Sequence, residues 1–443
     1  MTDCTSSAQL RKKVKKRTIH VNFDGGDVST NGGSVLLKAV DDKLGLLDKV
    51  AKVFVDKRDQ SHVKHQLANL IKQRVFGIAC GYGDLNDHQQ LRLDGAVQSS
   101  VGVLHTLASP STLCRLEATA ERQYAVDIHA LMLEQFVASH AQPPSSLILD
   151  FDGTDDRVHG EQQHRHYNTH YDGYCFFPLY VYCGEKLLVS YLRPSDRGDR
   201  RHAAAILSLL VKQLRSHWPD VRITFRGDAG FQSPLLLAWC DRHRVEYIMG
   251  FGGNVKLKAH YQGEIDALST VWEGLEAEDP GRDGVKLFDE LPYQAGSWRR
   301  ERRVIAKLEH NAMGANQRYI VTSLEGEPED LYSDVYCERG TMENRHKEAQ
   351  MGLFADRTSC HEWWANQLRV MFSALAYTLL QEIRETALSG TKLAKAQVWT
   401  LREKLLKIGA VVLRNTRRIE LRMNSNCLDK SLFLQTLARL GAT

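Results

Sequence analysis

Apolar residues recur at helical spacing in the first third of the chain and at strand spacing after it. Between Ser34 and about Phe136, stretches such as VLLKAVDDKLGLLDKVAKVF and VKHQLANLIKQRVFGIACGY repeat their apolar positions every three to four residues, which is the period of an amphipathic helix. Residues 1–30 are basic and then rich in Gly, Asp and Asn, which predicts a flexible arm. The pattern predicts a helical domain for DNA binding or dimerisation over residues 31–145, with AQPPSS as the following linker.

The period then shortens to that of β-strands. SLILDFDG, CFFPLYVYC and KLLVSYLRP are three short β-rich runs, followed by a helix, the strand VRITFRGD, a second helix and the strand EYIMGF. Three meandering strands followed by α-β-α-β is the order of ribonuclease-H-like domains. Because a crossover helix separates them, the first and fourth strands are expected to pair in parallel. Residues 146–251 therefore form the first part of such a core.

Residues 252–335 interrupt this core. GVKLFDELPYQA, RRVIAKLEH and RYIVTSLE read as strands, which predicts a mainly β insertion, with RYIVTSL a candidate to rejoin the main sheet. Two helices, over about 336–351 and 362–385, complete the core within residues 336–386, and residues 387–443 form a basic C-terminal segment. The predicted fold class is α/β: a ribonuclease-H-like catalytic domain with a mainly β insertion, preceded by a helical N-terminal domain.

Composition adds concentrated positive charge to this picture. The 443 residues are 43% hydrophobic and 25% charged, with a net charge of +4, as in soluble globular proteins. Bases nevertheless cluster in RKKVKKR (11–17), in WRRERR (298–303) and between residues 401 and 422. Each cluster alone fits a solvated surface, but three favour a polyanionic partner, because bases beside phosphates release counterions.

Cysteine usage and hydropathy limit the class of protein further. The nine scattered cysteines include no CxxC pair, so neither a zinc ribbon nor a disulfide framework is indicated, and free thiols are typical of a reducing interior. We see no signal region and no apolar run of bilayer-spanning length. We therefore expect a cytoplasmic protein without a membrane partner.

Two aspartates end apolar strands. In LILDFDGTDD the strand period places Asp150 and Asp152 on one face, and Asp228 ends VRITFRGD. An unpaired carboxylate is costly to bury there, and a metal cation at the sheet edge would remove that cost. If the two strands are neighbours, Asp152 and Asp228 can share a cation. The alternative is that each aspartate opens a turn or caps a helix.

A third acid lies on the helix that follows the insertion. Tyr336, Arg339, Glu343, Lys347 and Gln350 are spaced 3, 4, 4 and 3 residues apart in YCERGTMENRHKEAQ, so they form one polar stripe. The stripe can present a carboxylate to a metal beside phosphate-binding groups. The alternative is an exposed face on which Glu343 and Lys347 form an ordinary pair.

Two strand-end aspartates and one helical glutamate suit phosphoryl transfer. Mg²⁺ prefers oxygen ligands and keeps several waters and substrate phosphate oxygens. Two such ions, about 3.5–4 Å apart, activate the attacking oxygen and stabilise the leaving one. The sequence therefore predicts a two-magnesium site at Asp152, Asp228 and Glu343, where Mn²⁺ is expected to substitute.

Motifs along nearly the whole chain carry a family resemblance: LGLLDKVAKVFVDKRD, QRVFGIACGYGDLNDH, LASPSTLCRLE, FPLYVYCGEKLLVSYLRP, FRGDAGF and YCERGTMENRHKEA. The chain resembles DDE transposases of bacterial insertion sequences, particularly insertion-sequence family 1380 and the related group with a Tyr-x2-Arg-x3-Glu-x6-Lys signature. The resemblance assigns the three acidic roles to Asp152, Asp228 and Glu343. The final Lys of the signature falls on Gln350, so either Lys347 supplies the charge from one turn earlier or the binding of DNA ends is weakened.

The resemblance implies an enzyme that binds the inverted-repeat ends of its element, cleaves them with water and joins the freed 3′-hydroxyls to target DNA. It implies a homodimer, because two ends must be held in one assembly, and a location at the bacterial nucleoid. In related enzymes with a β insertion the cut passes through a DNA hairpin and a Trp stacks on a flipped base. Trp298 or Trp272 is the candidate here, and a core Trp is the alternative.

The remaining candidates for DNA contact come from the signature and the basic clusters. They are Tyr336, Arg339, Lys347, Arg299, Arg300, Lys12, Lys13, Lys15 and Lys16. Two other functions stay open: a decayed or domesticated DNA-binding protein, which only Gln350 favours, and a ribonuclease-H-like nuclease without strand transfer.

Overall fold

The computed structural model describes residues 7–9, 14–196, 198, 200, 202–278 and 284–441. Two of the predicted DNA contacts, Lys12 and Lys13, lie outside the described residues. The chain divides into two compact units, one drawn from residues 1–120, 352–354 and 375–443 and the other from 121–351 and 355–374. Among the described helices, none combines the length and the apolar character needed to cross a bilayer.

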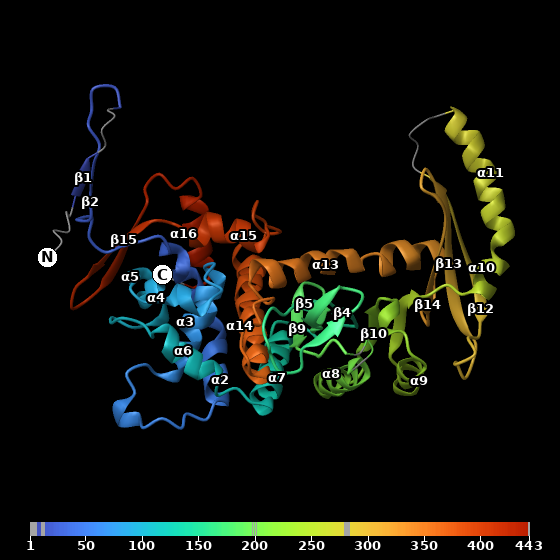
Figure 1. The fold of residues 1–443 in the computed structure, drawn as a ribbon, viewed down its shortest axis with the longest axis horizontal. Helices are drawn as coiled ribbons and strands as arrows, with labels where there is room; N and C mark the ends of the chain where they lie inside the picture. The colour runs from blue at the N-terminus through green and yellow to red at the C-terminus, as the bar shows by residue number, and fades with distance from the viewer. Residues whose placement is uncertain are drawn as a thin grey trace. The chain divides into compact units, whose positions relative to one another are not determined.

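The first unit combines helices from both ends of the chain (Figure 1). Its elements are α1 (Val35–Leu44), α2 (Leu46–Val53), α3 (Leu67–Ala79), α4 (His88–Leu91), α5 (Gly95–Val101), α6 (Pro110–Glu117), α15 (Val398–Leu401), β15 (Ala410–Arg414), β16 (Ile419–Met423) and α16 (Lys430–Arg439). β15 pairs with both β16 and β3 (Val28–Ser29). The segment that the sequence set apart as a basic C-terminal piece is therefore part of the same unit as the N-terminal helices.

Residues expected to form a flexible arm contain a strand pair. β1 (Ser7–Gln9) and β2 (His20–Asn22) pair antiparallel, and Val14 and Arg17 form an isolated bridge between them. The arm prediction rested on composition alone, and composition does not register this pairing between short segments.

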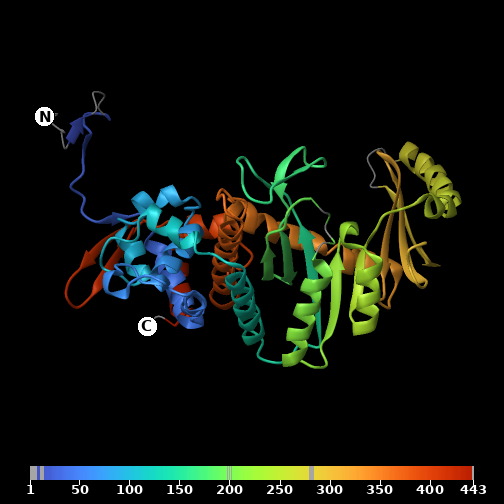
Figure 2. The same cartoon turned by 60° about the horizontal axis from the view of Figure 1, so that its bottom comes forward.

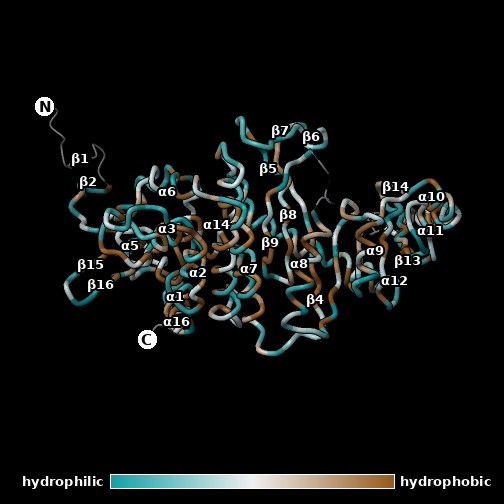
Figure 3. Tube along the Cα trace, turned by 90° about the horizontal axis from the view of Figure 1, so that it is seen from below, coloured by the Kyte–Doolittle hydropathy of each residue, from teal (hydrophilic) through white to brown (hydrophobic). Residues whose placement is uncertain are grey.

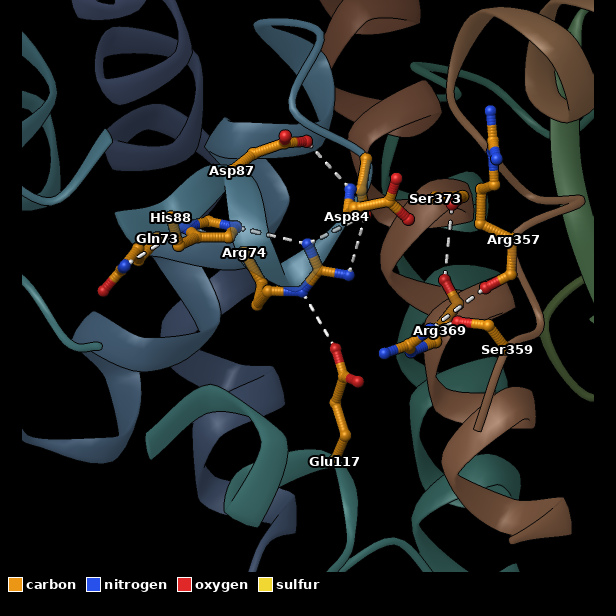
Figure 4. A network of polar contacts seen from close by, with 11 residues as sticks. Gln73, Arg74, Asp84, Asp87, His88, Glu117, Arg357, Ser359, Arg369 and Ser373 are labelled. Atoms are coloured by element: carbon orange, nitrogen blue, oxygen red, sulfur yellow. Dashed lines mark hydrogen bonds and ion pairs between the residues drawn. The ribbon is translucent and has the colours of Figure 1, made fainter. Parts of the chain in front are cut away.

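A buried polar network connects the helices of the first unit (Figure 4). Arg74 Nε donates to Glu117 Oε1 at 2.9 Å, and both side chains are almost wholly buried. His88 lies against the same guanidinium, and Gln73 bonds both His88 and the backbone of Ala108. Because buried polar groups are costly unless they are paired, this network fixes how α3, α4 and α6 pack.

The second unit is built on an eight-stranded mixed sheet in the order β12-β13-β14-β11-β10-β4-β8-β9. Its strands are β4 (Ser146–Gly153), β8 (Leu179–Cys183), β9 (Lys186–Tyr191), β10 (Arg222–Gly227), β11 (Glu246–Phe251), β12 (Val285–Tyr293), β13 (Arg302–Asn311) and β14 (Gly314–Thr322). β10 pairs in parallel with β4 on one side and with β11 on the other. The predicted parallel pairing of the first and fourth core strands is confirmed.

Helices cover this sheet, and a small sheet extends from it. The helices are α7 (Arg122–Ala138), α8 (Ala203–His217), α9 (Pro234–His243) and α13 (Arg339–Lys347), and α14 (Trp363–Glu382) begins in this unit. The small sheet comprises β5 (Asp156–Arg157), β6 (His166–Asn168) and β7 (Gly173–Phe176). In Figure 2 the small sheet projects beyond the main one. It is only partly teal in Figure 3, because β7 includes the buried, apolar Cys175 and Phe176, and α8 and β4 carry brown, hydrophobic stretches.

The two faces of the main sheet differ in polarity. Leu149 and Phe151 of β4 and Phe225 of β10 are buried in one apolar cluster with Leu207 and Leu214 of α8. The alternate residues of β4 and β10 point to the opposite face and, apart from Ile148, are polar. The strand period thus produces one apolar face beneath α8 and one face that can carry chemistry.

The free edge of β9 is covered by polar side chains of two helices. Ser190 N donates to His129 Nε2 of α7 at 3.1 Å. Gln367 of α14 accepts from Leu192 N at 2.7 Å and donates to Ser190 O at 2.9 Å. Capping these backbone groups prevents the edge from pairing with another strand.

The insertion agrees with the prediction in one respect and differs from it in another. Its three strands extend the main sheet, since β14 pairs antiparallel with β11, which confirms that RYIVTSL rejoins the sheet. The segment also contains the helices α10 (Val255–His260), α11 (Gln262–Glu278) and α12 (Pro328–Asp330), so "mainly β" is incomplete. Ile265 and Trp272, seven residues apart on α11, are both buried, and this helical spacing was the signal that the strand-like runs obscured.

Candidate active site

The ends of β4 and β10 bring two predicted acids side by side. The parallel register sets Arg222 opposite Ser146 and Gly227 opposite Phe151. Continued by one residue, the same register puts Asp228 opposite Asp152. Asp152 is the penultimate residue of β4 and Asp228 directly follows β10, so the two acids lie at the same edge of the sheet.

The Asp152 side chain is only 14% exposed. Burial raises the pKa of this carboxyl to about 7; nearby Arg339 opposes the rise, whereas the negative charges of Asp228 and Glu343 add to it. The three predicted acids therefore act on one another electrostatically. With a pKa of about 7 this carboxyl is only partly ionised at neutral pH, and more positive charge close to it would favour the ionised form.

Asp228 has a second, local role. Its Oδ1 accepts a hydrogen bond from Gly230 N at 2.9 Å and caps the short helical turn η4 (Ala229–Phe231). The alternative from the sequence, that this aspartate caps a turn, therefore also describes Asp228. The two roles are compatible, because the cap occupies one carboxylate oxygen and leaves the other available.

α13 lies over the polar face of the sheet. Met342 and His346 are buried beneath it, whereas the Glu343 side chain is 50% exposed. The guanidinium of Arg339 connects helix and strand: Nη2 lies 3.1 Å from Glu343 Oε1, and Nη1 lies 3.9 Å from Asp152 Oδ1. The predicted polar stripe therefore does face the strand-end acids through Arg339 and Glu343.

His346 is a contact that sequence reasoning missed. Its ring stands edge-on to Tyr180 with centroids 4.4 Å apart, and Nδ1 lies 3.9 Å from Asp152 Oδ2. Burial lowers the pKa of His346 to about 4, so the ring is neutral at physiological pH. The signal was its position three residues after Glu343, which places it on the adjacent, inward face of the helix.

Arg226 and Asp150 were also missed as a pair. Arg226 Nη2 donates to Asp150 Oδ2 at 2.7 Å, Nε donates to Asp150 Oδ1, and Nη1 donates to Val335 O at 2.5 Å. The pair connects β4 and β10 to the segment that enters α13. The available signal was that Asp150 and Arg226, which carry opposite charges, each stand two residues before a strand-end acid. Only the register of the strands shows that they meet.

The other members of the signature are divided between the site and its surroundings. Tyr336 is the last residue of the π-helical segment Leu331–Tyr336. Its hydroxyl packs closely against Gly250 of β11, where a Cβ would lie only 2.8 Å from the hydroxyl oxygen. Burial raises the pKa of Tyr336; the positive charge of Arg339 opposes this and Asp228 adds to it. Lys347 is exposed. Gln350 donates from Nε2 to the Asp155 carbonyl at 2.8 Å, which connects the end of the helical segment to the loop after Asp152.

The remaining candidates are either buried, paired with other residues or exposed to solvent. Trp298 is 4% exposed and packs against Phe251 and Tyr293, so its ring presents no open face for stacking. Trp272 is equally buried. Arg300 pairs with Asp241 at 2.6 Å. Arg299, Lys15 and Lys16 are exposed.

The donor set suits a hard divalent cation. All three acids offer carboxylate oxygens, and the raised pKa of Asp152 shows a buried charge that Arg339 compensates only in part. Over the residues that the structure describes, no three acidic, imidazole or thiol side chains are close enough together to form a ready metal site. The carboxylate chemistry of the three acids fits such an ion, and closing the ligand set around it would require the acids to move closer together.

Comparison with known proteins places the chain in a family. No curated protein matches it significantly. Among solved structures, a piggyBac transposase in a synaptic complex with hairpin DNA is similar at 13% identity and a TM-score of 0.43, covering 84% of this chain and 79% of that one. The model of the family "Transposase DDE domain group 1" matches residues 11–443. That match extends over almost the whole sequence, and the chain belongs to this family of DDE transposases.

Proposed function

We propose that this protein is a cut-and-paste DNA transposase whose second unit is a ribonuclease-H-like catalytic domain with Asp152, Asp228 and Glu343 as its metal-binding acids. The family match supports the class of reaction, and the three acids mark the proposed site of that reaction. The observation that carries the proposal is the parallel register of β4 and β10, which aligns Asp152 with Asp228 beneath the helix that bears Glu343.

The residues around the acids have distinct parts in this proposal. The chemistry that divalent cations, expected to be Mg²⁺, supply when bound there is activation of the attacking oxygen and stabilisation of the leaving one. Arg226, fixed by Asp150, holds the α13 entry against the strand ends through Val335 O. Neutral His346 fills the space beside Asp152 and excludes water from it. In this proposal Tyr336 and Arg339 contact the DNA backbone.

The proposed substrates are the inverted repeats that terminate the element and a target duplex. A homodimer would hold two ends, and exposed bases such as Lys347, Arg299, Lys15 and Lys16 would contribute sequence-independent phosphate contacts. The proposal predicts water-dependent cleavage followed by attack of the 3′-hydroxyl on target DNA. Cleavage through a DNA hairpin stays a prediction from the family resemblance.

The test uses the inverted repeats found in the DNA that flanks the gene. Purified protein with Mg²⁺ and a labelled end duplex is expected to release the end and to join it to plasmid. Asp152→Ala, Asp228→Ala and Glu343→Ala should each abolish both products while binding, measured by gel shift, is retained. Asp220→Asn is the matched control, because Asp220 is exposed near the opposite end of β10 and should leave both products unchanged.

Each outcome of this assay separates the alternatives. Cleavage without plasmid joining would favour a nuclease, and binding without cleavage in Mg²⁺ or Mn²⁺ would favour a decayed DNA-binding protein. Full cleavage by any of the three alanine variants would reject the assignment of the acids.

A further inference from the structure

Arg339 occupies the centre of the acidic group. It forms an ion pair with Glu343 at 3.1 Å, stands 3.9 Å from Asp152, and lies within electrostatic range of Asp228. Its side chain is only 16% exposed. One guanidinium thus interacts electrostatically with all three carboxylates.

Few hydrogen bonds hold this guanidinium in place. Nη2 of Arg339 donates to Glu343 at 3.1 Å, whereas Nη1 is buried and has no hydrogen-bond partner within the described part of the chain. Arg226 of β10, by contrast, makes a two-pronged pair with Asp150 and a third bond to Val335 O. Arg226 is therefore fixed in the fold, and Arg339 is retained mainly by the charge of the acids.

A divalent cation bound at this site would depend on the same negative charge of the three acids that now retains Arg339. Three carboxylates that repel one another can approach only around a cation, and a guanidinium already neutralises part of their charge. The planar guanidinium also keeps its partners farther apart than metal–oxygen bonds of about 2.0–2.1 Å would allow. The guanidinium and the ion cannot both lie between Asp152 and Glu343.

We propose that Arg339 is an internal competitor of the divalent cation: it neutralises Asp152, Asp228 and Glu343 in the DNA-free protein and must leave them before the ion binds. This inference rests on the proposed function, because it takes these acids to be the metal ligands. A guanidinium released from carboxylates is well matched to a phosphate, which it binds with two parallel hydrogen bonds. DNA that draws Arg339 away would therefore raise the affinity of the site for the ion, and a bound ion would raise the affinity for DNA by the same factor.

The direction of the effect distinguishes competition from a supporting role. If Arg339 competes, Arg339→Gln should bind Mn²⁺ more tightly than the wild type in the absence of DNA, with a Kd lower by roughly tenfold, within the usual range of coupling between sites. If Arg339 instead holds the site in shape, the same variant should bind Mn²⁺ more weakly.

The experiment titrates the full-length protein with Mn²⁺ and follows the free ion by electron paramagnetic resonance. Arg157→Gln is the control, because it removes the same charge from an exposed arginine that pairs with Asp155, beside but outside the acidic group. Its Kd should equal that of the wild type. Circular dichroism and melting temperature without metal confirm that each variant is folded.

A second variant separates this inference from the proposed function. Asp152→Asn should abolish Mn²⁺ binding in both backgrounds if the acids are the ligands. Retained binding in Asp152→Asn would overturn the proposed metal site itself. Loss of binding in Asp152→Asn together with an unchanged or higher Kd in Arg339→Gln would keep the site and overturn the competition.

Discussion

Arg226 and Asp150 face each other across neighbouring parallel strands and form a buried two-pronged ion pair. The pair lies one strand repeat before Asp228 and Asp152. Its third hydrogen bond, from Arg226 to Val335 O, extends the hold to the segment that leads into α13. The same two strands thus carry the candidate acids and the contact that sets the helix above them.

Removing one partner of this pair should destabilise the second unit strongly. Arg226→Met or Asp150→Leu alone leaves a buried charge without its partner, which costs about 3–5 kcal/mol of the free energy of unfolding. The double variant should recover most of that loss, because no charge remains buried. Chemical denaturation followed by circular dichroism measures all three. The double variant should still cleave DNA poorly, since the bond to Val335 O is gone; full activity would show that this bond does not position α13.

Asp156 should make the protein less stable as the pH rises. It is 1% exposed; burial raises the pKa of its carboxyl to about 7, the hydrogen bond from Thr358 opposes the rise, and Asp356 and Asp155 add to it. In the unfolded chain this carboxyl loses its proton near pH 4. Between these values only the folded state holds the proton, so the free energy of unfolding falls through this window, by up to about 4 kcal/mol above pH 7.

Asp156→Asn removes this titration while keeping an oxygen to accept the bond from Thr358 Oγ1. We expect the variant to melt at a higher temperature than the wild type at pH 8 and at nearly the same temperature at pH 4. Thermal melts at both pH values provide the check, and Asp172→Asn, at an exposed aspartate, is the control. An equal gain at both pH values would contradict the assignment of the buried charge to Asp156.

Gln350 should act as a positioning residue. Its side chain holds the Asp155 carbonyl, so Gln350→Ala should slow cleavage about fivefold, which corresponds to the loss of one hydrogen bond of about 1 kcal/mol. Gln350→Lys restores a donor and adds a charge. It should cleave at least as fast as the wild type and steepen the salt dependence of DNA binding by about one phosphate contact.

Gel-shift titrations at several salt concentrations test the charge effect, and single-turnover cleavage tests the positioning. Gln262→Lys, at an exposed position on α11, adds the same charge elsewhere and should leave the cleavage rate unchanged. If Gln350→Ala cleaves at the wild-type rate, the bond to Asp155 has no positioning role.

Trp298 distinguishes core packing from base stacking. Its buried indole packs on Phe251 and Tyr293, so Trp298→Ala should lower the free energy of unfolding by about 3–5 kcal/mol, as large-to-small core changes do. Trp298→Phe should retain most of the stability and all of the cleavage. A stable Trp298→Ala protein that fails only in the second-strand cut would instead support stacking on a flipped base.

The local signals of the sequence were sufficient for the element types and for part of the topology. Strand period placed Asp150 and Asp152 on one face, the crossover helix required parallel pairing, and helical spacing put Arg339 and Glu343 on one stripe. All three follow from the fixed periods of strand and helix, which depend on the backbone alone. The strand-like runs of 285–322 were found for the same reason, whereas the helix α11, which precedes them, was missed.

The sequence by itself determined which residues could carry the chemistry: two aspartates at strand ends, a glutamate on a helix, and bases to meet phosphate. Only the tertiary structure decided their neighbours. It set Arg226 against Asp150, Arg339 among the three acids, His346 beside Asp152, and Trp298 in the core. These contacts join segments far apart in the chain, and they depend on register and packing, which no local period of a sequence encodes.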